Sequence, residues 1–482
     1  MSISRSSWLF LVVRVFATFL FTLPASADYT YVVTTGSDLK ELRVNLCFEG
    51  TSPDALIAES MDAPIALKSV KAESGAEIVP SGLIPTRDLG PNSCLDYSVD
   101  VSRGVQRHDM TGPKVSRFKN AIAISNGLWF WRPESIEEDR RIFVSFILPD
   151  NYAVSTSWSS LSDGPNFKFE VPRAPYDWPS WIVVGQFSYE RVSILGTRFN
   201  ITIIDGSPSV EVEEMVSWLS QEARMVQSSI GKLPFSEVEI ILFPNARARQ
   251  PVPIAYVTRG GGPALHLRIN QRRLHHEFIK DWTATHELSH LFLPFVVPED
   301  AWFYEGLASY YQNVIRSRGG LMSQADAWSN ILYGFRRGSR EAEVRQISLR
   351  DATERMYRGE PFMYVYWGGA AMMLLADVKL RRDSDGQWSL DRLVREFDSC
   401  CVDKTKEWTA KEILSKFDAF YGEPVFIPLM DKYLDTHNFP DVSRVVKELG
   451  LTIDGRTVTL LDDAPRREIR DAIMLGTGGS EL

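Results

Sequence analysis

The chain has 482 residues, of which 44% are apolar and 24% are charged. This composition is typical of a globular protein with an ordinary hydrophobic core, and it excludes a disordered or fibrous chain. The 53 basic and 62 acidic residues give a formal charge of -9, so no basic excess is available to neutralise a nucleic-acid backbone. We therefore expect two to four domains, at about 100 to 200 residues per domain, and no nucleic-acid partner.

Residues 1–27 resemble a secretory signal peptide. Arg5 precedes an apolar run over residues 8–23, and Ala25-Ser26-Ala27 is a small-x-small cleavage pattern. The alternative is an uncleaved membrane anchor, but Arg14 interrupts a run that is already shorter than the roughly 20 residues a span needs. We expect cleavage after Ala27, a secreted or periplasmic protein, and no stable membrane insertion after cleavage.

The four cysteines fall into two pairs. Cys47 and Cys94 lie in one β-rich region, where export would permit a disulfide, and the pattern leaves open whether they form one. Cys400 and Cys401 are adjacent, which is poor geometry for a bridge between them. The prediction for this second pair is two partly buried thiols.

Residues 28–186 are predicted to form a β-sandwich-like domain. Short segments of alternating polarity are separated by Gly, Pro, Asn and Asp, and no long helical period competes with them. The clearest predicted strands are residues 29–34, 43–48, 142–148 and 167–171. Pro172, Pro175 and Pro179 then crowd a stretch that suits a domain boundary.

Residues 187–388 are predicted to mix strands with helices. The predicted strands are residues 198–204, 238–243, 254–258 and 264–269. Between the first two of them, apolar residues recur at three- and four-residue spacing, which predicts one apolar helix face. The members of this face include Met215, Leu219, Ala223, Val226 and Ile230.

The remaining residues are predicted as a helical subdomain, 389–462, and a flexible tail, 463–482. Thr409-Ala410-Lys411-Glu412 forms a capping box at the start of one helix, and Gly422 is placed to end it. The tail prediction rests on its polar composition and its Gly-Thr-Gly-Gly-Ser-Glu-Leu ending.

The strongest chemical signal is the pentapeptide His286-Glu287-Leu288-Ser289-His290. On a helix, predicted here over residues 278–293, side chains four residues apart lie one above the other, so both histidines can reach one metal ion. Catalytic zinc takes three protein ligands and leaves a fourth position to water. We therefore expect one Zn²⁺ per chain and a third ligand further along the sequence.

Three downstream acids are candidates for that ligand. Glu299 and Asp300 follow Pro298 and are typical of the first residues of a helix. Glu305 lies inside the otherwise apolar segment 302–311, where an unpaired carboxylate is costly. The prediction is ligation by Glu305, and the alternative is a salt-bridged structural glutamate.

His286-Glu287-Leu288-Ser289-His290, followed by Trp302-Phe303-Tyr304-Glu305-Gly306-Leu307-Ala308-Ser309-Tyr310-Tyr311, resembles the gluzincin zinc metallopeptidases. Within that group the chain most resembles the glycyl aminopeptidase family, which is related to the alanyl aminopeptidase and leukotriene hydrolase families. The resemblance implies a multidomain α+β fold with a β-sandwich-like N-terminal domain, a thermolysin-like α/β zinc-peptidase domain and a C-terminal helical domain. It also implies that Glu287 takes a proton from the attacking water.

A tyrosine is a further candidate. Tyr366 opens Tyr366-Trp367-Gly368-Gly369, which resembles a helix start where these relatives place a tyrosine whose hydroxyl stabilises the oxyanion. A phenol suits that task because it donates a hydrogen bond without carrying charge in the ground state. Tyr364 is the rival candidate, and an aromatic side chain that only packs at a helix start is the alternative.

Gly260, Gly261 and Gly262 occupy the place where these relatives have a glycine-rich edge strand that pairs with the substrate backbone. Glycine permits such a close approach, so the three are predicted to bind substrate, with a simple turn as the alternative. The aminopeptidases also carry a glutamate there that holds the substrate's free amine. This chain has Gly-Gly-Gly-Pro-Ala and no acid at that position.

These residues predict a secreted or periplasmic zinc-dependent metallopeptidase that acts on peptides or proteins through a zinc-activated water, with aminopeptidase action as one form. A catalytically silent peptide- or envelope-binding protein on the same fold is the alternative, which the missing glutamate favours. A third hypothesis is hydrolysis of a non-peptide bond, because zinc polarises any carbonyl. No pattern in the sequence indicates an oligomeric state.

Overall fold

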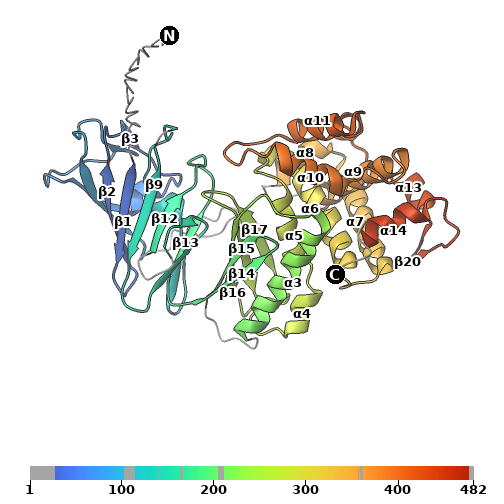
Figure 1. Ribbon diagram of the computed structural model, residues 1–482, viewed down its shortest axis with the longest axis horizontal. Helices are drawn as coiled ribbons and strands as arrows, with labels where there is room; N and C mark the ends of the chain where they lie inside the picture. The colour runs from blue at the N-terminus through green and yellow to red at the C-terminus, as the bar shows by residue number, and fades with distance from the viewer. Residues whose placement is uncertain are drawn as a thin grey trace, which may run out of the picture.

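The computed structural model describes residues 28–102, 114–138, 140–162, 167–204, 211–356, 358 and 362–476. The predicted signal peptide, residues 1–27, lies outside this part of the chain. A β-rich domain, a mixed α/β region and a helical region follow one another along the long axis of the molecule (Figure 1). The predicted multidomain α+β architecture is therefore confirmed. No helix of the described part is both long and apolar enough to span a membrane.

The N-terminal domain consists of two stacked sheets. Alternating residues of both sheets, such as Tyr31 and Val44 of one and Ile124 and Val184 of the other, share a single core between them. The larger sheet has the order β11-β12-β9-β1-β2-β6-β4, with β1 Tyr29–Thr35, β2 Glu41–Phe48, β4 Leu67–Ala72, β6 Cys94–Asp100, β9 Ile142–Ile147, β11 Ser159–Ser160 and β12 Phe167–Val171. The smaller sheet has the order β10-β13-β8-β7, with β7 Val115–Arg117, β8 Ala121–Ser125, β10 Ala153–Thr156 and β13 Trp181–Gly185.

Short elements complete this domain and lie outside the two sheets. They are the two-stranded sheet of β3 Ala55–Leu56 and β5 Ile84–Pro85, and the single-turn helices α1 Ala63–Ala66 and α2 Asn126–Trp129.

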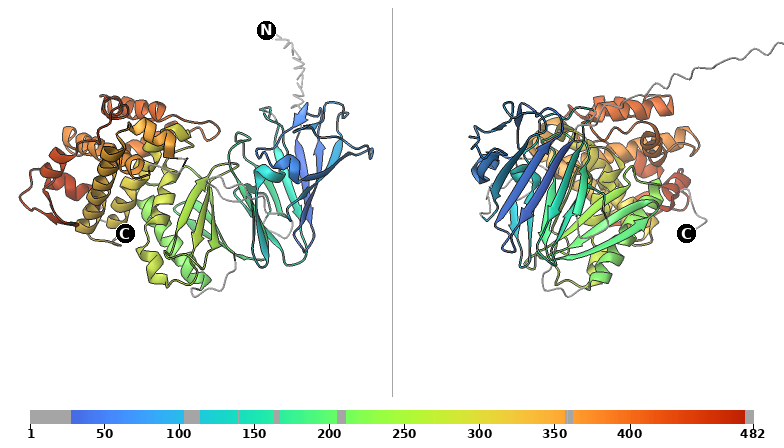
Figure 2. Two further views of the ribbon diagram at one scale, coloured as in Figure 1. Left: turned by 180° about the vertical axis from the view of Figure 1, so that it is seen from behind. Right: turned by 60° about the vertical axis from the view of Figure 1, so that its left-hand side comes forward.

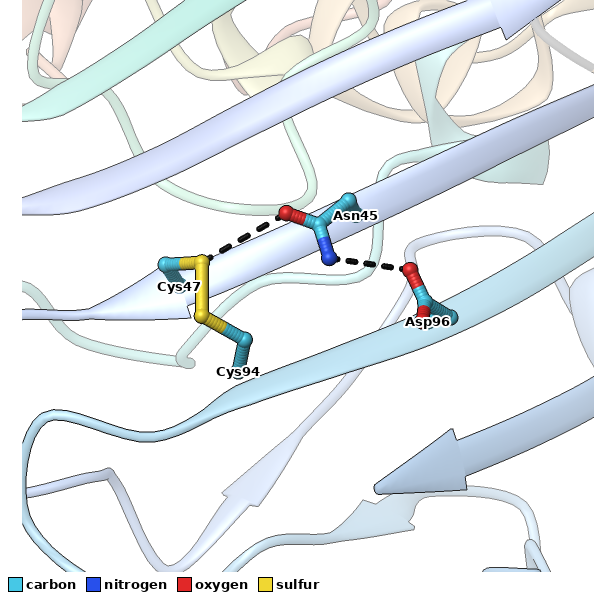
Figure 3. Close-up of a disulfide and its surroundings, with 4 residues drawn as sticks. All are labelled: Asn45, Cys47, Cys94 and Asp96. Atoms are coloured by element: carbon cyan, nitrogen blue, oxygen red, sulfur yellow. Dashed lines mark hydrogen bonds between the residues drawn. A yellow bond between two sulfur atoms is a disulfide. The ribbon is translucent and has the colours of Figure 1, made fainter. Parts of the chain in front are cut away.

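A disulfide joins two neighbouring strands of the larger sheet. Cys47 of β2 and Cys94 of β6 stand directly opposite one another, with their Cα atoms 4.1 Å apart. The cross-strand pair two residues away is Asn45 and Asp96, and Asn45 Nδ2 donates a hydrogen bond to Asp96 Oδ1 at 2.9 Å (Figure 3). The cross-strand pairing thus answers the question that the sequence left open for this pair.

The adjacent cysteines also form a disulfide, so the prediction of two thiols is wrong. Cys400 is the last residue of helix α10, Leu390–Cys400, and Cys401 leaves the helix with φ -134° and ψ -6°. The prediction assumed a regular backbone, in which neighbouring side chains diverge. At a helix end the chain turns, and the two sulfur atoms can then meet.

The mixed region is built on a five-stranded sheet of order β14-β15-β16-β18-β17. Its strands are β14 Ser188–Ile194, β15 Thr197–Ile203, β16 Glu237–Pro244, β17 Ile254–Thr258 and β18 Ala264–Ile269. β15, β16 and β18 are parallel, and β17 is an antiparallel edge strand. Helix α3, Val212–Ile230, covers one face with its predicted apolar side. Five of the seven residues at this spacing are buried, and Val212 and Val216 are partly buried.

The other face of this sheet packs on the smaller sheet of the N-terminal domain (Figure 2). Trp181 and Val183 of β13 meet Ile241 and Phe243 of β16 in a small apolar core. A polar contact crosses the same interface, because Ser155 Oγ of β10 donates to Glu239 Oε1 of β16 at 2.5 Å. The N-terminal domain is therefore fixed to the five-stranded sheet, because the smaller sheet buries apolar residues on both of its faces.

The helical region shares one continuous hydrophobic core with the five-stranded sheet. The predicted boundary at residue 388 falls between α9 and α10, and this core runs across it. The helices after the metal-binding segment are α6 Ala301–Arg318, α7 Gln324–Arg345, α8 Leu349–Met356, α9 Phe362–Asp383, α10, α11 Ala410–Tyr421, α12 Phe426–Tyr433, α13 Ser443–Glu448 and α14 Arg467–Leu475, with the hairpin β19 Leu451–Asp454 and β20 Thr457–Leu460 before α14.

Two glycines bring α6 and α9 unusually close together. A Cβ placed on Gly369 would lie 1.8 Å from the carbonyl oxygen of Trp302, and one on Gly306 would lie 2.5 Å from the backbone of Gly369. Only glycine permits this separation of the two helix backbones. Glu305 of α6 and Tyr366 of α9 are consequently neighbours.

The tail prediction is wrong for residues 467–475. Residues 467–475 form α14, which buries Ile469, Ile473 and Met474 in the main core. Arg470 is also buried, and its Nη1 donates to the carbonyl oxygen of Leu461 at 2.7 Å. These apolar residues recur at four- and five-residue spacing, a helical signal that the polar composition of the segment hid. Residues 477–482 lie outside the described part.

Candidate metal centre

The HExxH segment lies on a short helix rather than on the single helix predicted over residues 278–293. Helix α4, His275–Lys280, ends at Asp281, whose backbone is extended and whose Oδ1 accepts a hydrogen bond from Thr283 N at 2.8 Å. Helix α5, Thr283–Ser289, follows, and the 3₁₀ turn His290–Phe292 continues it. The backbone stays helical at His290, so the rings of His286 and His290 still lie on one face, with centroids 4.9 Å apart.

A buried arginine holds the break between α4 and α5. Arg316 of α6 donates to the carbonyl oxygens of Ile279 at 2.7 Å and Asp281 at 2.8 Å, and to Glu222 Oε1 of α3 at 3.2 Å. Glu222 Oε2 in turn accepts a hydrogen bond from Thr285 Oγ1 of α5 at 2.5 Å. Burial raises the pKa of Glu222 to about 7, although the charge of Arg316 and the bond from Thr285 oppose the rise. This cluster of Arg316, Glu222 and Thr285 anchors helix α5 to α3 and α6.

Arg316→Met should therefore lower the free energy of unfolding by about 3 to 5 kcal/mol, because it leaves the Glu222 carboxylate buried without its cation. The measurement is urea unfolding followed by circular dichroism. Arg350→Met is the matched control, since Arg350 and Asp435 form an exposed ion pair, which is worth less than about 1 kcal/mol. Equal losses in the two variants would contradict this role for Arg316.

Three side chains converge on one point between α5 and α6. His286 Nε2 lies 3.1 Å from Glu305 Oε2, and His290 Nε2 lies 3.5 Å from the same oxygen. One ligand atom from each of the three residues lies within 4.8 Å of the others, as a metal site requires. The structure thus brings together the three predicted metal ligands.

The other two acidic candidates lie away from this cluster. Asp300 precedes α6, and its Oδ2 accepts a hydrogen bond from Ala410 N at 2.7 Å, so it caps the start of α11. Glu299 is exposed in the 3₁₀ turn Pro298–Asp300. Both have the helix-start placement that the sequence predicted.

Gln312 orients the first histidine, a role that the sequence analysis missed. Its Oε1 lies 2.8 Å from His286 Nδ1, which it can hold as the N–H donor, so that Nε2 is left to face Glu305. Metal-ligating histidines generally donate their second ring nitrogen to such an acceptor. The signal was present in the sequence, because Gln312 lies seven residues after Glu305 and hence on the same side of α6.

The charges of His290 and Glu305 match the states that metal ligands need. Burial lowers the pKa of His290 to about 3, so its ring is neutral. Burial alone would raise the pKa of Glu305, but the two histidines and a hydrogen bond from the Tyr366 hydroxyl outweigh it and lower that pKa. For His286, burial is opposed by the hydrogen bond and charge of Glu305, which raise its pKa. A neutral imidazole and an ionised carboxylate are ready to ligate a cation.

Glu287 lies in the middle of α5, is buried, and is close enough to His286 and Glu305 for their charges to act on it. Burial raises its pKa to about 7, with Glu305 adding to the rise, while His286 and Arg259 oppose it. Arg259 comes from the end of β17, and its Nη2 donates to the carbonyl oxygen of His290 at 2.9 Å. A carboxyl group that titrates near neutral pH suits proton transfer in both directions.

The structure separates the two candidate tyrosines. The Tyr366 hydroxyl bonds to Glu305, and the Tyr366 ring is stacked on His286 at 5.8 Å between centroids. The Tyr364 side chain faces the core, where it packs against Phe439, and its buried hydroxyl has no hydrogen-bond partner in the described structure. Tyr366 is therefore the tyrosine at the metal cluster.

The three glycines form the turn between β17 and β18, and this turn packs against the N-terminal domain. A Cβ on Gly260 would lie 2.2 Å from the carbonyl oxygen of Trp178, and one on Gly262 would lie 2.2 Å from that of Ser157. The three glycines therefore form the simple turn of the alternative and pack closely between the domains, and a contact with substrate stays a prediction. The sheet edge left for a substrate backbone is β17, where Ile254 is 52% exposed.

A family model covers this site. Residues 272–370, which include both histidines, Glu287, Glu305 and Tyr366, match the M61 glycyl aminopeptidase model. The metal-site segment is similar to that of the glycyl aminopeptidases. The predicted resemblance to this family is thereby confirmed, and so is the prediction of a peptide-bond hydrolase. No match is found among curated protein sequences.

Solved structures extend the likeness beyond residues 272–370 to the fold. An aminopeptidase N family protein from Idiomarina loihiensis superposes with a TM-score of 0.68 at 15% identity, covering 91% of this chain and 82% of that one. An M1 zinc metallopeptidase from Deinococcus radiodurans gives 0.54 at 14%, covering 86% and 94%. Native yeast LTA4 hydrolase gives 0.52 at 13%, covering 85% and 67%. At these identities the likeness shows the arrangement of the three regions.

Proposed function

We propose that this protein is a zinc-dependent peptidase that holds one Zn²⁺ at His286, His290 and Glu305 and hydrolyses peptide bonds there. The observation that carries the proposal is the convergence of three ligand atoms, a buried carboxylate and a tyrosine hydroxyl at one point. Each of these groups has a distinct task in the addition of water to a carbonyl. A structural helix pair would need none of them.

The residues present fit zinc. Two imidazole nitrogens and one carboxylate oxygen are a donor set of catalytic zinc sites, and Gln312 fixes the ring of His286 in the tautomer that ligation needs. A bound zinc ion would supply Lewis-acid polarisation of the scissile carbonyl.

The side chains around the cluster perform the proton transfers. Glu287 accepts a proton from the attacking water and passes it to the leaving amine. Tyr366 donates its hydroxyl hydrogen bond to the carbonyl oxygen as that oxygen becomes negative. The exposed edge of β17 offers backbone groups that can pair with an extended peptide beside the cluster.

Aminopeptidase action is one form of this activity, and it needs an acid beside the cluster to hold the substrate's free amine. The turn after β17 carries Arg259 and three glycines and no acid. The proposal is therefore peptide-bond hydrolysis in general and does not specify aminopeptidase action. Contacts outside the cluster set the position of the cut.

We also propose that the protein acts outside the cytoplasm, in the periplasm or after secretion. The support is the signal-peptide pattern of residues 1–27, together with two disulfides, which persist in oxidising compartments. N-terminal sequencing of protein recovered from the native host's envelope should begin at Asp28.

Glu305→Ala tests the metal assignment. Wild-type protein should bind one zinc per chain, and the variant should lose at least about 100-fold in zinc affinity and its peptidase activity with it, because even outer contacts of such sites are worth 10- to 100-fold. Competition with a chromogenic chelator measures the affinity. Glu299→Ala is the matched control and should behave as wild type.

Undiminished zinc affinity in Glu305→Ala would show that the ligand set is wrong. A wild-type protein that binds zinc and peptides but never cleaves them would favour the silent binding protein instead.

A further inference from the structure

A cavity of about 150 Å³ lies beside the carboxyl end of the metal-binding helix, where the two domains meet. Its walls come from the N-terminal domain, the turn after β17, the start of β16, the residues that follow the 3₁₀ turn His290–Phe292, and the loop after α10. Trp178 and Phe295 are stacked in its lining at 4.5 Å, and Phe235 adds a third aromatic surface. The volume is several times that of a water molecule, which is about 30 Å³, so a side chain can enter.

The lining of this cavity is positively charged, although the chain as a whole has a formal charge of -9. Arg173, Arg259 and Lys404 all line it. Glu237 is the acid among the described lining residues, and it is already paired with Arg198. None of the three cations has a carboxylate within ion-pair distance in the described structure. The cavity therefore favours an anionic occupant.

Arg259 has hydrogen-bond donors to spare. Its Nη2 serves the carbonyl oxygens of His290 and Leu293, at 2.9 and 3.5 Å. Its Nε and Nη1 are buried without a partner. A purely structural anchor would need only Nη2. Buried donors left unpaired are costly, so the unpaired Nε and Nη1 point to a ligand that accepts hydrogen bonds from them.

Two of the three cations are arranged around one aromatic ring. The Arg259 guanidinium lies 5.4 Å from the centroid of Phe235, and Lys404 Nζ lies 5.1 Å from it. The ring and the stacked pair of Trp178 and Phe295 offer apolar surface to methylene groups. A carboxylate on a short aliphatic stem matches this combination of apolar walls and cationic donors.

The cavity also adjoins the metal cluster. Arg259 is bonded directly to the backbone of the ligand residue His290, and Pro294 and Phe295 of the lining follow that residue in the chain. Arg259 therefore connects the lining of the cavity to the backbone of the cluster.

We propose that this cavity is a specificity pocket that binds a carboxylate of the substrate, so that the enzyme prefers acidic peptides. The inference rests on the proposed peptidase function and names its substrate class. The carboxylate comes from an aspartate or glutamate side chain or from the free carboxyl end of the peptide.

The test is peptide binding to the zinc-loaded Glu287→Gln protein, followed by tryptophan fluorescence. The probes are peptides that carry Glu, Gln or Lys at one varied position, each with a free or an amidated carboxyl end. We expect Glu peptides to bind at least about 10-fold more tightly than Gln peptides, because one charge-assisted pair is worth that much. The preference should disappear in Arg259→Gln and fall several-fold in Lys404→Gln.

Lys406→Gln is the matched control, since Lys406 lies on the same loop, pairs with Glu412 and is outside the lining. It should leave the preference unchanged. Lys404 is exposed, so its variant reports on the pocket even where Arg259→Gln fails to fold. A preference that vanishes on amidation would assign the carboxylate to the chain end.

Equal binding of Glu and Gln peptides with free and amidated ends would overturn the pocket. So would a preference that survives both pocket variants. Wild-type turnover without any acidic preference would refute the pocket and leave the proposed function standing. Acid-selective binding without turnover in wild type would support the pocket and refute the proposed function.

Discussion

Replacing Glu287 by glutamine is expected to lower kcat/KM for peptide hydrolysis by at least about 100-fold while zinc content and thermal stability stay near those of wild type. The amide has the shape of the carboxylate but cannot accept the proton of the attacking water. Because Glu287 is buried beside the cluster, no bulk-water base replaces it. Steady-state kinetics with an internally quenched peptide, together with metal analysis, measure both quantities.

The pH profile gives a second view of the same group. Burial raises the pKa of Glu287 to about 7 in the metal-free site, and the charge of a bound zinc ion lowers it from there. Activity should fall on the acidic side, because Glu287 is protonated below its pKa and can then accept no proton. The acidic limb should lie at or below pH 7 in wild type and be absent from the residual rate of Glu287→Gln. Wild-type turnover in that variant would contradict the mechanism.

Tyr366→Phe is expected to lower kcat by about 100- to 1,000-fold, the usual effect of removing one oxyanion donor, with KM nearly unchanged. The phenyl ring keeps its stacking on His286, so folding and substrate binding should persist. The hydroxyl bonds to Glu305 in the substrate-free structure, which shows that it reaches the cluster. Steady-state kinetics separate kcat from KM, and calorimetry checks the fold.

Tyr364→Phe is the internal control. Its hydroxyl is buried without a partner, so its removal should leave kcat unchanged and should not destabilise the protein. A selective fall of kcat in Tyr364→Phe, or equal kinetics in Tyr366→Phe and wild type, would show that another group holds the oxyanion.

The strands and the clustering of His286, His290 and Glu305 were predictable because each depends on a local pattern. The predicted segments 167–171, 254–258 and 264–269 coincide with β12, β17 and β18, since strand alternation is written in consecutive residues. The spacing of His286 and His290 placed both rings on one face even though the helix ends between them. The apolar surroundings of Glu305 marked it as the residue that needed a partner.

What the sequence hid depends on contacts between distant segments. The break between α4 and α5 is held by Arg316, which lies 35 residues after Asp281 in the chain. The place of Gly260 against Trp178 requires the N-terminal domain to be in position. No period in the sequence carries such pairings, because they form only when separate elements pack.

Two other features, helix α14 and the role of Gln312, had a local signal in the sequence, but a competing signal favoured another interpretation. Ile469 and Ile473 lie on one face of α14, but the surrounding charges favoured a tail. Gln312 shares a helix side with Glu305, yet an amide in an apolar helix also suits a structural hydrogen bond. In both helices the residues on one face carried the signal, and the overall composition of the segment concealed it.

Digestion of a mixed peptide library by the mature protein tests the central claim most directly. The products are identified by mass spectrometry in three samples: untreated protein, protein treated with a chelator, and chelated protein to which zinc is restored. We predict cleavage in the first, none in the second and recovery in the third, and at least about 100-fold slower cleavage by Glu287→Gln. Cleavage that persists without metal, or a zinc-loaded protein that cuts no peptide at all, would contradict the account.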